Sequence, residues 1–73
     1  MKLHAVIISK DKYNLANAKR EAKKFISDNK KYYRETTESY RFRNIPKTKF
    51  NYKTFITKKL NNGVSLVYGM LKK

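Results

Sequence analysis

The sequence predicts one α+β domain over residues 1–73, in which a single helix packs on a mostly antiparallel sheet of four to five strands. Three observations support this prediction. Residues 14–29 alone have apolar side chains at helical spacing. Residues 40–45 begin with a strict alternation of aromatic and arginine side chains, which is typical of a half-buried strand. Asn62-Gly63 lies between two apolar segments, and this dipeptide is the strongest short signal for a β-hairpin. The predicted element order is β-α-β-β-β-β.

The first expected strand is residues 3–9, which are apolar and rich in β-branched side chains. Because the segment lacks alternation, we expect both of its faces to be covered and the strand to be central in the sheet. The helix follows a polar connection. Asn14 is the expected N-cap, with Asp11 as the alternative, and Asn29 is the expected left-handed residue at the other end. The expected apolar face comprises Leu15, Ala18, Ala22, Phe25 and Ile26.

The strand of residues 40–45 has two unlike faces. Tyr40 and Phe42 share one face and are expected to point toward the helix, so that Arg41 and Arg43 project together from the other face. Alternate residues of a strand lie about 7 Å apart, and each guanidinium can fork to a phosphate. This strand therefore predicts an anion-binding surface; the alternative is an ordinary solvated sheet face.

The remaining strands are short. Residues 32–35 are expected to form the second strand, and Pro46 ends the third because proline cannot donate to a ladder. Residues 47–53 are expected to be a loop or an irregular edge. Residues 54–60 and 64–71 then form a hairpin whose type I′ turn needs positive φ at both Asn-Gly residues.

The charge of the chain is strongly positive and unevenly distributed. Nineteen Lys and Arg residues against five Asp and Glu residues give a formal net charge of +14. Residues 39–73 contain no acid at all. So positive a body favours a polyanionic partner, with nucleic acid the first candidate. Codon bias of an A+T-rich genome is an alternative source of the many lysines, although it does not explain why acids are scarce.

Several classes of function are not expected from this composition. With no Cys, the chain has neither a disulfide framework nor a Cys-based zinc site. The longest charge-free apolar run is residues 5–8, so neither a membrane-spanning helix nor a signal peptide is expected, and the chain is not expected to be secreted. The single histidine, His4, is expected to be partly buried and structural. We expect no enzyme activity, no metal and no cofactor.

The few glycines and acids have ordinary structural explanations. Gly69 within a strand predicts a bulge or a close approach to the backbone. Glu21 lies three residues before Lys24 on the helix, so the two are expected to pair. Nothing places two carboxylates in different environments of one cleft, as general acid–base catalysis requires.

The candidate site consists of basic side chains with interleaved aromatic ones. If exposed, Phe50 or Tyr52 is expected to stack on bases. With six or seven phosphates neutralised, the expected slope of log affinity against log salt on duplex DNA is about −5 to −6. The basic side of the helix, Lys19, Arg20, Lys23 and Lys24, is a secondary candidate. The main anion-binding candidates are Arg41, Arg43, Lys47, Lys49, Lys53, Lys58 and Lys59.

The chain also resembles a small domain of unassigned function that recurs in proteins of tailed bacteriophages and large DNA viruses. The resemblance covers nearly the whole chain, implies a viral origin and names no catalytic residue. The chain departs from the pattern of that domain in residues 47–53, which are richer in lysine. The matching positions are His4-Ala5-Val6-Ile7-Ile8, Ala18-Lys19, Tyr40-Arg41-Phe42-Arg43, Phe55, Thr57, Leu60, Gly63-Val64, Val67-Tyr68-Gly69 and Leu71.

Two functional hypotheses follow. The first is a non-enzymatic viral or phage protein, in the host cytoplasm or the virion, that binds DNA or RNA mainly through the phosphate backbone. The second is a protein-interaction module, either a structural component of the virion or an inhibitor that docks on an acidic host protein. No membrane partner is expected, because the apolar face of the helix is small and is needed by the sheet.

Overall fold

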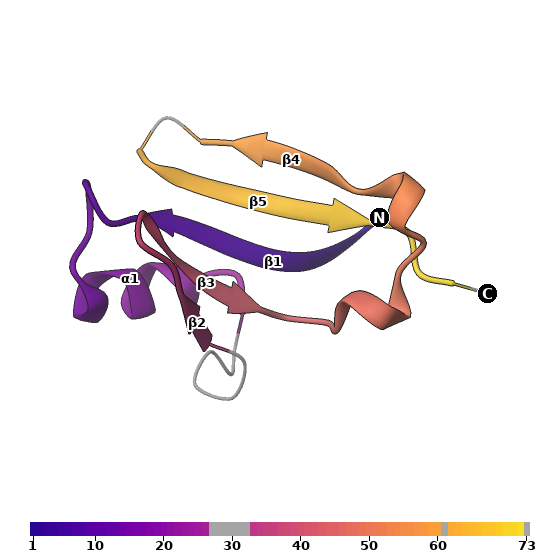
Figure 1. Cartoon of the computed structure of the whole chain (residues 1–73), viewed down its shortest axis with the longest axis horizontal. Helices are drawn as coiled ribbons and strands as arrows, with labels where there is room; N and C mark the ends of the chain where they lie inside the picture. The colour runs from indigo at the N-terminus through magenta and orange to yellow at the C-terminus, as the bar shows by residue number, and fades with distance from the viewer. Residues whose placement is uncertain (27–32, 61, 73) are drawn as a thin grey trace.

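The computed structural model describes residues 1–26, 33–60 and 62–72. In this part of the chain one α-helix accompanies a five-stranded antiparallel sheet, so the predicted α+β class is confirmed (Figure 1). The strand order in the sheet is β2-β3-β1-β5-β4, which differs from the order along the chain. The elements are β1 (Lys2–Ser9), α1 (Leu15–Ala22), β2 (Tyr33–Glu35), β3 (Ser39–Arg43), β4 (Ile56–Lys59), β5 (Val64–Gly69) and the 3₁₀ turns η1 (Lys47–Lys49) and η2 (Tyr52–Thr54).

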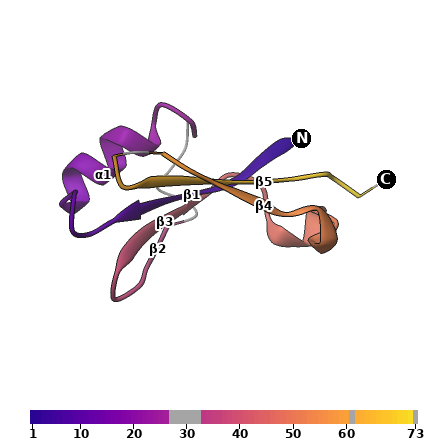
Figure 2. The same cartoon turned by 90° about the horizontal axis from the view of Figure 1, so that it is seen from above.

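Strand β1 is the middle strand, as predicted. It pairs antiparallel with β3 on one side and with β5 on the other, so the hairpins β2–β3 and β4–β5 flank it. We expected both faces of this strand to be covered by other parts of the chain, and each face is covered over only part of its length. Helix α1 lies over one face at one end of the sheet, and the η1–η2 segment lies on the opposite side at the other end (Figure 2).

The helix begins where predicted and ends earlier. The side chain of Asn14 accepts a hydrogen bond from the backbone N–H of Asn17 at 2.9 Å, as an N-cap does. After Ala22 the backbone N–H groups of Lys24 and Phe25 donate to the residue three positions back, whereas that of Ile26 donates four positions back to Ala22, so the α-helix ends in a turn. The expected apolar residue Phe25 is 36% exposed, contrary to the prediction, and Asn29 lies outside the described residues.

The main core lies between α1 and the sheet, and we call this part of the molecule the helix end. Ala18, Ala22 and Ile26 are buried against the sheet, as expected from their spacing. Phe42 is completely buried and Tyr40 packs against the same cluster, so the predicted orientation of this strand is confirmed. The sheet residues at the centre of the helix end are Val6, Ile8, Phe42, Val64 and Leu66.

A second, smaller cluster lies on the other side of the sheet, and we call it the aromatic end: His4, Phe50, Phe55 and Gly69. The pairing of β1 with β5 shifts by one residue between Leu3 and Ala5, which makes His4 the extra residue of a bulge. The His4 ring centroid lies 5.2 Å from that of Phe50 and 5.0 Å from that of Phe55. A Cβ added at Gly69 would lie 2.8 Å from both phenylalanine rings, so the predicted close approach at Gly69 is confirmed.

The last hairpin forms, but not with the predicted turn. Among the described residues, only Gly63 has positive φ, at 84°, so the expected type I′ geometry at Asn62 is wrong. The backbone N–H of Leu60 donates to the Val64 carbonyl at 2.7 Å, which closes a longer loop than the predicted one. The expected loop of residues 47–53 contains η1 and the start of η2.

Candidate nucleic-acid interface

The side of the sheet opposite α1, which we call the open face, carries a hollow of about 650 Å³. We call it the arginine groove. Four cationic side chains line it: Arg34, Arg41, Arg43 and Lys47. Its apolar lining includes Ala5, Ile7, Phe55 and Val67, and no acidic side chain among the described residues lines it.

The strand register brings the arginines together. Arg34 lies directly opposite Arg41 in the β2–β3 pair, and Arg41 lies opposite Ile7 in the β1–β3 pair. Directly opposite residues have Cβ atoms about 4.5–5.5 Å apart on the same face, and like charges so placed destabilise a sheet. Neither Arg34 nor Arg41 has an ion-pair partner among the described residues. The pair therefore concentrates positive charge that an anion would stabilise.

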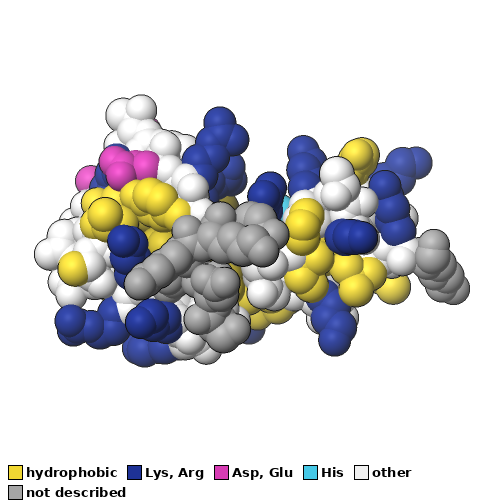
Figure 3. Space-filling view, turned by 90° about the horizontal axis from the view of Figure 1, so that it is seen from below, with side chains coloured by type: hydrophobic (Ala, Val, Ile, Leu, Met, Phe, Trp, Pro, Cys, Tyr) yellow, Lys and Arg dark blue, Asp and Glu magenta, His cyan; other side chains and the backbone are white. Residues whose placement is uncertain are grey.

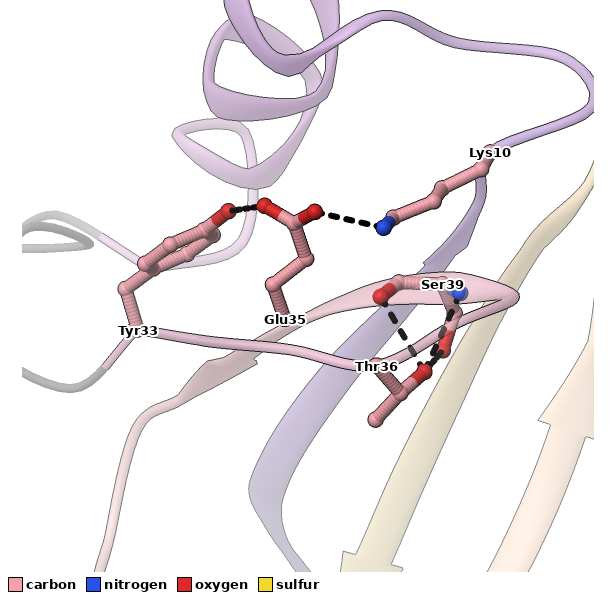
Figure 4. A network of polar contacts seen from close by, with 5 residues as sticks. All are labelled: Lys10, Tyr33, Glu35, Thr36 and Ser39. Carbon is pink, nitrogen blue, oxygen red and sulfur yellow. Dashed lines mark hydrogen bonds and ion pairs between the residues drawn. The ribbon is translucent and has the colours of Figure 1, made fainter.

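The acid nearest in sequence to these arginines is held on the other side of the sheet. Glu35 accepts hydrogen bonds from Lys10 Nζ at 2.5 Å and from the Tyr33 hydroxyl at 2.7 Å (Figure 4). The bond to Lys10, followed by that to Tyr33, lowers the pKa of Glu35. Burial, followed by the bond to Glu35, raises the pKa of Tyr33 to about 12. Glu35 is thus an ionised carboxylate already paired, and it does not neutralise the groove.

A second hollow on the open face, the mixed hollow, has a different charge balance. It has a volume of about 630 Å³ and shares Ile7 with the arginine groove. Its lining includes the cations Lys10 and Lys59 but also the acids Asp11 and Glu38. In the view of Figure 3 the visible acidic side chains gather at one end of the molecule, whereas Lys and Arg side chains occur along its whole length.

The predicted cationic set is only partly brought together. Arg41, Arg43 and Lys47 line the arginine groove, and Lys59 lies on the same face in the mixed hollow. Lys58 pairs with Leu66 and therefore projects from the side that carries α1.

Other members of the predicted set lie away from both hollows. Lys49 and Lys53 line neither. The secondary set on α1 lies across the sheet from the groove, where the Lys19 ammonium is 6.0 Å from the centre of the Tyr33 ring. The predicted pair of Glu21 and Lys24 is confirmed, with 3.1 Å between the charged groups.

The two aromatic candidates have different outcomes. Phe50 is completely buried, so the expectation that it stacks on a base is wrong: its ring packs against His4 and Phe55 and lies over Gly69. Tyr52 is 60% exposed but does not line the groove. The ammonium groups of Lys47 and Lys72 lie 5.6 and 5.5 Å from the centre of the Tyr52 ring, within cation–π distance.

His4 has the predicted structural role. Its Nδ1 donates to the Ile45 carbonyl at 2.7 Å, because a carbonyl oxygen only accepts. The bond ties the bulge of β1 to the segment that leads into η1. Among the described residues, no group of three or more His, Cys, Asp or Glu side chains is placed to hold a metal ion.

Arg34 is a groove residue that the sequence analysis missed. The available signal was the Thr36–Ser39 turn, in which the Thr36 N–H donates to the Ser39 carbonyl at 2.9 Å and the two side chains hydrogen-bond (Figure 4). Such Ser/Thr turns are recognisable in sequence. A hairpin that reverses at the Thr36–Ser39 turn places Arg34 beside Arg41.

Comparison with known proteins finds no match: no family model, no curated protein and no solved structure is similar to this chain. Within the described residues, no helix has the length and apolar character needed to cross a membrane. Function is therefore inferred from the geometry and charge of the groove.

Proposed function

We propose that this protein binds nucleic acid through phosphate groups seated in the arginine groove. The observation that carries the proposal is the convergence of three arginines and Lys47 on one hollow with no acidic lining residue among those described. The viral origin and the host or virion location implied by the sequence remain predictions attached to this role.

The chemistry of the groove suits phosphate. A guanidinium donates two parallel hydrogen bonds to phosphate oxygens, and such charge-assisted bonds are about twice as strong as neutral ones. The repulsion between Arg34 and Arg41 is relieved when an anion binds between them, because they lie opposite one another in the register. Phosphate binding thus adds guanidinium–phosphate attraction and also relieves the repulsion between Arg34 and Arg41 in the free protein.

The number of converging cations sets the expected salt dependence. The groove lining contains four cations, Arg34, Arg41, Arg43 and Lys47. At roughly −0.7 per neutralised phosphate on a single strand or −0.9 on duplex DNA, the slope of log affinity against log salt is about −3 to −4. This is shallower than the value expected from the sequence, because Lys58 and the lysines outside the groove are not counted.

The test compares two double variants that remove the same charge. Arg34→Ala plus Arg41→Ala removes two of the four cations that line the groove, whereas Arg20→Ala plus Lys23→Ala removes two exposed cations of the helix region. We expect the groove variant to lose about 10- to 100-fold in affinity for an oligonucleotide and the control to lose less than about threefold. Equal losses in the two variants would show that binding depends only on the overall positive charge of the protein and not on the groove.

A second candidate function, protein interaction, has its own supporting observation. On the side of the sheet that carries α1, Ile56 pairs with Tyr68, and Ile56 is 54% exposed. Met70, just after β5, is 56% exposed. Nuclease treatment of the natively purified protein separates the candidates: a nucleic-acid partner is removed, whereas an acidic host protein or a virion protein stays bound.

A further inference from the structure

We infer that the arginine groove takes a single nucleic-acid strand rather than a duplex, with phosphates on the arginines and bases on the apolar stripe beside them. This inference rests on the proposed function and deepens it by naming the form of nucleic acid. The observation behind it is the division of the arginine groove into a side lined by arginines and a side lined mainly by apolar residues.

That division follows from the register. Across the sheet, Arg34 on β2 lies beside Arg41 on β3, which lies beside Ile7 on β1. In the next row Arg43 lies beside Ala5, and Ala5 lies beside Val67 on β5. Within the groove the three arginines therefore lie on β2 and β3, and Ile7, Ala5 and Val67 form an apolar stripe beside them. Beyond Ile7 the first row continues with Ser65 and Lys59, which line the mixed hollow and not the groove.

A single strand matches both sides of the groove. Its phosphates lie along one edge and its bases along the other, and the faces of unpaired bases pack on apolar and aromatic side chains. Ile7, Val67 and Phe55 are each only partly buried, so the protein leaves these surfaces accessible in the groove. In a duplex the base faces are stacked within the helix, and the apolar stripe would have no partner.

The shape of the groove agrees with a narrow ligand. The β2–β3 hairpin and the η1–η2 segment both lie on the open-face side of β1 and β5, one toward each end of the sheet (Figure 2). The hollow they help to define is about 650 Å³, within the range of sites that enclose a small ligand. A short stretch of one strand fits such a hollow, whereas a double helix rests on outer surfaces.

The test uses three probes with the same backbone chemistry: an oligodeoxythymidine of about 10 nucleotides, an abasic strand of equal length and a duplex of equal length. We expect the oligodeoxythymidine to bind at least about tenfold more tightly than the abasic strand. We also expect it to bind more tightly than the duplex at the same salt concentration. Equal affinity for all three, or preference for the duplex, overturns the inference and leaves the proposed function standing. Absence of binding to any probe overturns both.

A pair of matched variants locates the base contact. Ile7→Thr changes the apolar stripe, and Ile56→Thr makes the same change at an exposed position on the opposite side of the sheet. Ile7→Thr should weaken binding of oligodeoxythymidine about threefold or more and leave the abasic strand unaffected, while Ile56→Thr should change neither. Unchanged abasic binding also shows that the variant has folded. Equal loss on both probes, or no loss on either, contradicts bases lying on the stripe.

Discussion

The helix end and the aromatic end cover opposite sides of the same sheet by different means. At the helix end an amphipathic helix buries Val6, Ile8 and Phe42 on one side. At the aromatic end an irregular segment with two 3₁₀ turns buries Phe50 on the other side and leaves Phe55 at the rim of the groove. A full-length helix on both sides would have covered the open face. The short second cover leaves it partly exposed, and the arginine groove lies there.

The comparison assigns different tasks to the two ends. The helix end holds most of the buried apolar side chains and should set the overall stability of the chain. The aromatic end is tied down by His4, and by Asn51, whose N–H donates to the Met70 carbonyl at 2.9 Å. It places Phe55 and Lys47 in the groove lining, so its integrity should affect binding directly.

The largest expected effect is at the centre of the helix end. Phe42→Ala deletes a completely buried ring and should lower the free energy of unfolding by about 3–5 kcal/mol. Denaturant unfolding followed by circular dichroism measures this change. Tyr52→Ala, which removes an exposed ring, is the control and should stay within about 0.5 kcal/mol. A small effect of Phe42→Ala would contradict the assignment of stability to the helix end.

The next effect is at the aromatic end. Gly69→Ala places a Cβ 2.8 Å from ring atoms of Phe50 and Phe55, so the rings must shift. We expect a loss of about 1–3 kcal/mol in the free energy of unfolding, as for other overpacked sites. Ser65→Ala on the same strand and the same face should be nearly neutral. Oligonucleotide binding should weaken in Gly69→Ala beyond what its unfolded fraction explains, because Phe55 lines the groove; unchanged binding would separate the aromatic end from the groove.

The two ends also differ in how far they were predictable. The helix end follows from local patterns: the spacing of Ala18 and Ala22 marks the helix, and the alternation at Tyr40 to Arg43 marks the strand. The pattern does not show where the helix ends, because Ile26 stays buried although it lies in the turn that follows the end of α1 at Ala22. Local periodicity thus predicted which side chains face the core better than it predicted element bounds.

The aromatic end could not be predicted in the same way because distant residues determine it. The bulge at His4 is tied to Ile45, 41 positions along the chain, and Phe50 is buried by residues from β1 and the segment before β4. No periodicity in residues 47–53 indicates these contacts. The groove was likewise predicted only in part: Arg41 and Arg43 follow from alternation, whereas Arg34 depends on the register of the β2–β3 hairpin.

A smaller effect tests the start of α1. Asn14→Ala removes the side-chain oxygen that accepts from the Asn17 N–H and should cost about 1 kcal/mol of unfolding free energy. Asn17→Ala, inside the helix, is the control and should be neutral or slightly stabilising, because alanine has the higher helix propensity. Neither variant should change oligonucleotide affinity once the folded fraction is accounted for. A loss of binding in Asn14→Ala would show that the helix end also shapes the groove.

The smallest expected effect is the pH dependence contributed by Glu35, which lies at the end of β2 opposite Tyr40. Its pKa is lowered in the folded chain, chiefly by the hydrogen bond from Lys10, so the unfolded chain takes up a proton at a higher pH than the folded chain does. The stabilisation is therefore present above the unfolded-state pKa and is lost as the pH falls through the folded-state pKa.

Glu35→Gln should be slightly less stable than the parent protein at neutral pH, and the free energies of unfolding of the two should converge in acid. Glu38→Gln removes the same charge with no ion pair among the described residues to break, so it is the control and should lose less stability at neutral pH than Glu35→Gln does. Because the Lys10–Glu35 pair is exposed, added salt should narrow the neutral-pH difference. A Glu35→Gln difference that persists in acid would assign the effect to packing rather than to charge.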